Sequence, residues 1–212
     1  MEEENPFIRW FILFVIGFIL VIVYQNQTSE YLTVRSTEDN ESYLVQKGPD
    51  AQDAANMLSR LKKSLIQLNR HLLLTYPKDE RSVQLNELFH PDSIIEAELD
   101  SDSTSYTINK GEKVVICLRA RDGTNRIEQY NILIFVALHE LSHILTESIG
   151  HTGEFWENFA WVLREAVKTG VWKYQDFTVN PVTYCGVKIT SCPLTRDEAE
   201  KAHLSATFAP NS

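Results

Sequence analysis

The chain has 212 residues, enough for one domain with a sizeable core. Acidic residues outnumber basic ones by 29 to 20, which gives a formal net charge of −9. Proteins that bind nucleic acid normally present a basic face, so this composition argues against nucleic acid as a partner.

The N-terminal segment is strongly apolar. After a short tail of residues 1–6, residues 7–24 contain one charged side chain, Arg9, and carry aromatic residues near both ends, as in Trp10 and Tyr24. This length is about that needed to cross a bilayer, and aromatic side chains are enriched at membrane interfaces. A secretory signal peptide would begin with basic residues, whereas this segment follows acidic ones. The pattern predicts one transmembrane helix and a single-pass membrane protein, with the membrane itself as a partner.

The remaining chain divides into three parts. Residues 25–49 are polar and show no period, so they are predicted to be a linker. Residues 50–195 have the patterns of a folded domain, and residues 196–212 are expected to be a C-terminal tail with one short helix. Within the domain, apolar residues at spacings of three and four predict a helix from about residue 50 to Tyr76.

Shorter elements follow. A second helix is predicted for residues 82–89, and two strands for residues 105–108 and 112–119. The residues between the strands have turn chemistry. The second strand is a candidate for pairing with an extended peptide substrate, or it is a plain sheet strand.

The most informative motif is His139-Glu140-Leu141-Ser142-His143, within an apolar helix predicted for residues 127–149. Two histidines four residues apart lie on one face of a helix, where both imidazoles can bind the same zinc ion. Glu140 lies off that face, so its carboxylate can act as general base toward a zinc-activated water. Because burying such groups is costly unless they are satisfied, a metal site is favoured over two hydrogen-bonded core histidines.

A catalytic zinc usually has three protein ligands and one water. Gly150 is expected to end the helix, so that the chain folds back and brings His151 under the metal. The alternative third ligand is a glutamate on the next helix, predicted for residues 153–169, where Glu157 and Glu165 are the candidates.

The three cysteines are too few for a disulfide-built fold. Cys117 lies in an apolar run and is interpreted as a small buried residue. Cys185 and Cys192 are close in sequence, and they either form a disulfide or remain free thiols.

Three motifs together resemble a known family: HELSH at residues 139–143, GHTGEFW at 150–156 and NPVTYCG at 180–186. From about residue 80 to 195 the chain is similar to the WLM and SprT-like minigluzincin metallopeptidases, and more closely to small predicted metallopeptidases of large DNA viruses. The resemblance implies Zn²⁺, peptide hydrolysis, the ligands His139, His143 and His151, and Glu140 as base. The gap of eight residues between His143 and His151 is longer than in the family's pattern.

The sequence therefore predicts an α+β fold, in which a small zincin-like sheet packs beside the central HExxH helix behind one transmembrane helix. The predicted function is a membrane-anchored zinc metallopeptidase that acts on a protein or peptide substrate. The alternative is a non-catalytic, membrane-anchored zinc-binding interaction module, which would not need Glu140. Repair of DNA–protein crosslinks, a role of better-known relatives, is disfavoured by the acidic composition. Tyr184 is either a stabiliser of the reaction's oxyanion or a structural residue, the latter being favoured.

Overall fold

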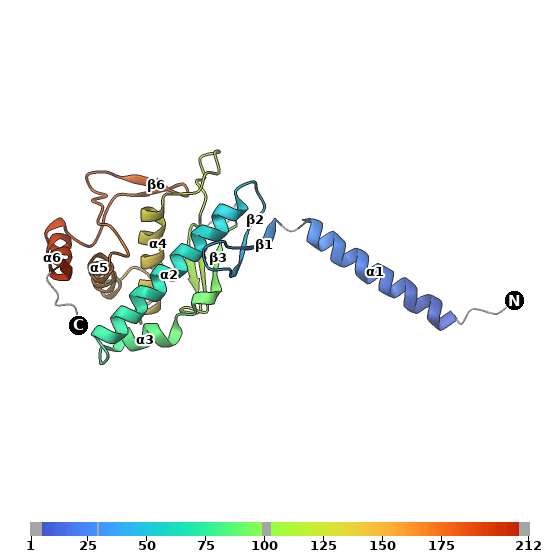
Figure 1. Ribbon diagram of the computed structural model, residues 1–212, viewed down its shortest axis with the longest axis horizontal. Helices are drawn as coiled ribbons and strands as arrows, with labels where there is room; N and C mark the ends of the chain where they lie inside the picture. The colour runs from blue at the N-terminus through green and yellow to red at the C-terminus, as the bar shows by residue number, and fades with distance from the viewer. Residues whose placement is uncertain (1–5, 29, 99–102, 208–212) are drawn as a thin grey trace.

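The computed structural model describes residues 6–28, 30–98 and 103–207 (Figure 1), and within the first range it describes the side chains of residues 7–21. The strands and helices from residue 30 onward form one α+β body. The helix α1 (Pro6–Thr28) extends away from it.

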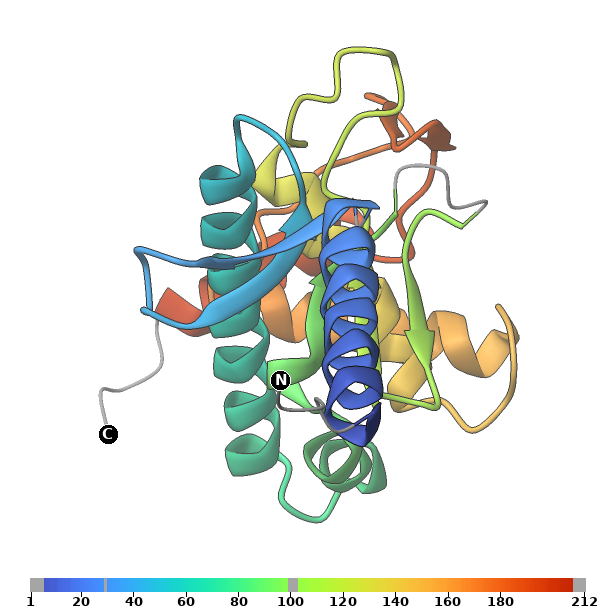
Figure 2. The ribbon, with the colours of Figure 1, turned by 90° about the vertical axis from the view of Figure 1, so that its right-hand side faces the viewer.

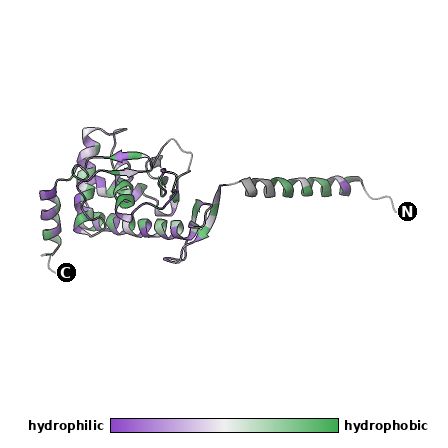
Figure 3. Cartoon of the chain, turned by 90° about the horizontal axis from the view of Figure 1, so that it is seen from above, coloured by the Kyte–Doolittle hydropathy of each residue, from purple (hydrophilic) through white to green (hydrophobic). Residues whose placement is uncertain are grey.

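The expected transmembrane helix is a prediction that the structure contradicts. In the part of the chain that the structure describes, there is no helix with the length and apolarity needed to span a membrane. Residues 7–21 of α1 are mostly apolar, and their side chains are exposed. Figure 3 shows these apolar residues along α1, outside the folded body. The membrane-anchored part of the fold and the single-pass localisation are therefore corrected.

A three-stranded sheet lies at the centre of the fold. Its order is β3 (Ile94–Glu96), β5 (Lys113–Ile116) and β4 (Tyr106–Ile108). The central strand β5 runs parallel to β3 and antiparallel to β4. Among the residues that the structure describes, β4 pairs with β5 alone, so it is an edge strand.

Two long helices cover the sheet and contact each other, α2 (Ala51–Thr75) and α4 (Tyr130–Ile144). The predicted apolar face of α2 is confirmed, since its leucines at spacings of three and four are fully buried: Leu58, Leu61, Leu65, Leu68 and Leu72. In the sequence, α2 is followed by α3 (Glu80–Leu88) and by a short 3-10 turn, η1 (Pro91–Ser93). The side chain of Asp79, the N-cap of α3, accepts a hydrogen bond from the Arg81 amide.

Part of the predicted linker is an antiparallel hairpin, β1 (Tyr31–Arg35) and β2 (Ser42–Gln46). Figure 2 shows it lying against the first turns of α2. Tyr43 and Val45 alternate along β2 and are buried in the core. Two alternating buried positions in a five-residue strand are too short a pattern to recognise in sequence, and the segment becomes a strand through its pairing with β1 and its packing against α2.

The helix α4 is shorter at both ends than predicted. At its start, Ile127 forms a β-bridge with Arg119 and is therefore outside the helix. At its end, the last helical residue is Ile144, six residues before Gly150. The side chain of Lys110 donates to the main-chain oxygens of Thr146 and Glu147, just beyond that end.

The C-terminal third adds α5 (Gly153–Lys168), the hairpin β6 (Val182–Tyr184) and β7 (Val187–Ile189), and α6 (Arg196–Thr207). Cys185, at the hairpin turn, forms a disulfide with Cys117 just beyond β5. Cys192 carries a free thiol, so a Cys185–Cys192 pair does not form and Cys117 is more than a buried apolar residue. The fold brings together residues that are 68 apart in sequence.

Candidate active site

His139 and His143 lie one turn apart on α4, and both rings point into the same cleft. The Nε2 atom of His139 is 3.2 Å from that of His143 and 2.9 Å from that of His151. All three ligand atoms lie within 4.8 Å of one another. Nitrogens bound tetrahedrally to zinc at about 2.0–2.1 Å would lie roughly 3.3 Å apart, which is close to the two separations from His139, so the group has the donors and spacing to hold such an ion.

The protonation state of the pair on α4 also suits a metal. Burial, together with the neighbouring imidazoles, lowers the pKa of His139 to about 3 and that of His143 to about 4. Both rings are therefore neutral at physiological pH, which is the form that binds metal. Phe155 contacts all three histidine rings and stacks on His143 at a centroid distance of 4.3 Å.

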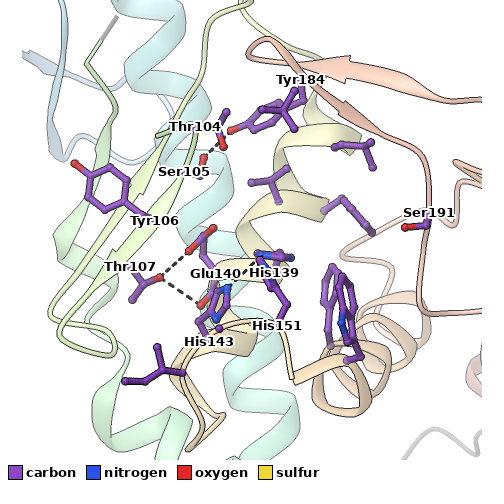
Figure 4. Close-up of a pocket in the computed structure, with 18 of the residues that line it drawn as sticks. Thr104, Ser105, Tyr106, Thr107, His139, Glu140, His143, His151, Tyr184 and Ser191 are labelled. Atoms are coloured by element: carbon purple, nitrogen blue, oxygen red, sulfur yellow. Dashed lines mark hydrogen bonds between the residues drawn. The ribbon is translucent and has the colours of Figure 1, made fainter. Parts of the chain in front are cut away.

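Glu140 is buried beside the three histidines, with its carboxylate directed away from their nitrogens and toward β4 (Figure 4). Oε2 accepts a hydrogen bond from Thr107 Oγ1 at 3.1 Å. Burial raises the pKa of Glu140 to about 7, against the opposing effect of the Thr107 hydrogen bond. A carboxylate with a pKa near neutrality is suited to take up and release a proton.

A cleft of about 680 Å³ opens above these residues. The edge strand β4 and the segment before it form one wall, and the hairpin β6–β7 with the following residues forms the opposite wall. Trp156 and Phe159 of α5 line the same cleft. The strand beside the cleft is thus β4, and β5, the strand considered for substrate pairing, is enclosed between two neighbours.

The two glutamates considered as a third ligand are elsewhere. Glu157 is exposed on α5. Glu165 is buried and accepts hydrogen bonds from Tyr76, Lys168 and the ring of His71. Among the described residues, the group with metal-ligand geometry contains three histidines and no glutamate.

Tyr184 lines the cleft but its hydroxyl group is already engaged. It donates to the main-chain oxygen of Cys117 at 2.7 Å and lies 2.7 Å from Ser105 Oγ. The residue is 2% exposed. These contacts favour the structural interpretation of Tyr184 over a role toward an oxyanion.

Sequence reasoning missed Thr107. It also missed Lys110 and Glu154, whose side chains hydrogen-bond to the main chain of the loop before α5. Thr107 occupies an ordinary strand position, and its proximity to Glu140 depends on how β4 packs against α4. A polar residue on a strand next to a turn gives no signal of this kind.

The chain is similar to several viral proteins. Uncharacterized protein R325 of Acanthamoeba polyphaga mimivirus is 29% identical over 182 residues, covering 84% of this chain and 92% of the relative. Uncharacterized protein 136R of Invertebrate iridescent virus 6 is 34% identical over 89 residues, or 42% of this chain and 49% of the relative. Uncharacterized protein 042R of Invertebrate iridescent virus 3 is 47% identical over 55 residues, or 26% of this chain and 33% of the relative. The viral relationship implied by the sequence motifs is therefore confirmed.

No family model matches the sequence. Among solved structures, that of Wss1 from Saccharomyces cerevisiae is similar with a TM-score of 0.39 and 18% identity, covering 56% of this chain and 81% of that one.

Proposed function

We propose that this chain is a zinc-dependent metallopeptidase, with His139, His143 and His151 as metal ligands and Glu140 as general base. The observation that carries the proposal is the convergence of three imidazole nitrogens beside a buried carboxylate in an open cleft. A structural zinc site would be closed by a fourth protein ligand. In the described residues no fourth histidine, cysteine or acidic side chain joins the group, so one coordination position is left for water or substrate.

The residues divide the work as follows. A bound Zn²⁺ would supply Lewis acidity toward the scissile carbonyl and lower the pKa of water. Glu140 takes a proton from the attacking water and delivers it to the nitrogen of the leaving amine. Thr107 holds the Glu140 carboxylate through its hydroxyl hydrogen bond.

The substrate class follows from the cleft wall. The outer edge of β4 offers main-chain groups to an added strand, so an extended peptide can pair with it across the cleft. The proposed substrate is therefore an extended segment of a protein or peptide.

Hydrolysis of an unfolded protein substrate by the full chain tests this function. Cleavage is expected with Zn²⁺, loss of cleavage with a chelator, and recovery when Zn²⁺ is restored. Glu140→Gln keeps the size of the side chain and removes the base, so the rate should fall roughly 10²–10⁴-fold. Equal rates for Glu140→Gln and the wild-type chain would sink the assignment of Glu140.

A further inference from the structure

His151, the third histidine of the group, lies in an exposed loop, so burial of its side chain does not fix its position. His151 belongs to the loop between the end of α4 at Ile144 and the start of α5 at Gly153. The loop side chains from residue 147 to 151 are exposed or half-buried, and Ile149 is 94% exposed. His151 Nε2 nevertheless lies 2.9 Å from His139 Nε2, so other contacts must fix the loop backbone.

The first contact comes from α5. Glu154 accepts hydrogen bonds from the main-chain amides of Glu147 at 2.9 Å and Ser148 at 3.2 Å, and from Ser148 Oγ at 2.6 Å. Ser148 Oγ also lies 2.6 Å from Oγ1 of Thr152, the N-cap of α5. One carboxylate thus joins two consecutive loop residues to the helix that follows.

The second contact comes from the turn between β4 and β5. Lys110 Nζ lies 2.9 Å from the main-chain oxygen of Thr146 and 2.8 Å from that of Glu147. Residue Glu147 is therefore held on both sides, its amide by Glu154 and its carbonyl by Lys110. The hydrogen bond from the Ser148 side chain is the main cause that lowers the pKa of Glu154, and the nearby charge of Lys110 adds a smaller effect.

We propose that Lys110 and Glu154 are positioning residues for His151, which clamp the backbone at Glu147 and so set the affinity for the metal. This inference rests on the proposed function, because it takes His151 as a ligand. Neither side chain belongs to the histidine group, and both act on main-chain atoms of the loop. Groups that orient metal ligands commonly change metal affinity by roughly 10–100-fold when removed.

The positive charge of Lys110 allows an electrostatic role to be distinguished from a positioning role. If Lys110 acted on the site only through its charge, its removal would strengthen the binding of a cation. If it positions His151, its removal weakens binding. The two explanations predict opposite signs for Lys110→Met.

The test is titration of the metal-free full chain with Zn²⁺. Lys110→Met and Glu154→Gln should each lose roughly 10–100-fold in affinity. Glu157→Gln is the matched control, since it removes the same charge from an exposed position on α5, and it should keep wild-type affinity. In a His151→Ala background neither clamp substitution should lower affinity further, because the effect passes through His151.

Wild-type affinity in both clamp variants, or an equal loss in the His151→Ala background, would overturn the inference while leaving the metal site intact. Absence of Zn²⁺ binding by the wild-type chain would remove the proposed function and the inference together, so that titration comes first. Thermal unfolding of the metal-free variants shows whether each of them folds. If Lys110→Met does not fold, Ser148→Ala removes two of the loop contacts and should weaken binding in the same direction.

Discussion

Thr107 on β4 donates a hydrogen bond to Glu140 on α4, with 3.1 Å between Oγ1 and Oε2. The edge strand that would pair with a substrate therefore contacts the proposed base directly. One hydroxyl group thus links the strand to the base across the packed contact of β4 with α4.

Replacing Thr107 with valine removes this hydrogen bond at nearly constant size. The turnover number for peptide cleavage should fall about 10-fold, equivalent to about 1.4 kcal/mol in the barrier. Thr107→Ser retains the hydroxyl and should keep most of the activity. An unchanged turnover number for Thr107→Val, measured on the zinc-loaded chain, would show that the hydrogen bond has no part in placing the base.

Glu165 offers a test that separates folding from metal binding. Its buried carboxylate accepts hydrogen bonds from Tyr76, Lys168 and His71. It therefore connects α5 to His71 on α2 and to Tyr76, the residue that follows α2. Glu165→Gln should lower the free energy of unfolding by about 1–3 kcal/mol, because the amide keeps one acceptor oxygen but replaces the other with a donor and removes the charge. Zinc content should stay as in the wild-type chain. Loss of zinc from a folded Glu165→Gln chain would instead revive Glu165 as a ligand.

The same residue predicts a pH dependence of stability. Burial acts to raise the pKa of Glu165, but hydrogen bonds from His71, Lys168 and Tyr76 outweigh it and hold the pKa below the usual 4.5. A carboxyl group with a lowered pKa in the folded state stabilises the fold above the unfolded-state pKa, and this contribution is lost as the pH falls through the folded-state value. Denaturant unfolding between about pH 7 and pH 3 should therefore show a smaller decrease for Glu165→Gln than for wild type. Parallel curves would contradict the assignment.

The disulfide between Cys117 and Cys185 attaches one wall of the cleft to the end of β5. Alkylation of the unfolded, non-reduced chain should label one thiol, that of Cys192, and labelling after reduction should reach all three cysteines. Cys117→Ser should lower the free energy of unfolding by about 2–4 kcal/mol. Three reactive thiols in the non-reduced chain would rule the disulfide out.

The parts of the fold that sequence predicted are those with local patterns. The buried leucines of α2 recur at helical spacing, and the turn at residues 109–111 marks the hairpin of β4 and β5. The placement of His139 and His143 follows from their separation of one helical turn. His151 lies beside them although the helix end expected at Gly150 is wrong, since α4 ends at Ile144.

What the sequence could not reveal depends on contacts between distant segments. Cys117 and Cys185 meet because the β6–β7 turn lies at the end of β5. Lys110 reaches the loop after α4 from a turn that precedes it by more than thirty residues. The apolar run at the N-terminus predicted a membrane span from composition alone, a prediction that the described helix does not support.

The central claim is that three histidines of this chain bind one zinc ion next to a base that is not a ligand. Zinc content of the purified full chain, measured for wild type, His139→Ala and Glu140→Gln, tests it most directly. The account predicts one zinc per chain in the wild type, loss of zinc in His139→Ala and full retention in Glu140→Gln. A wild-type chain that takes up no zinc after reconstitution, or a His139→Ala chain that keeps it, would contradict the claim.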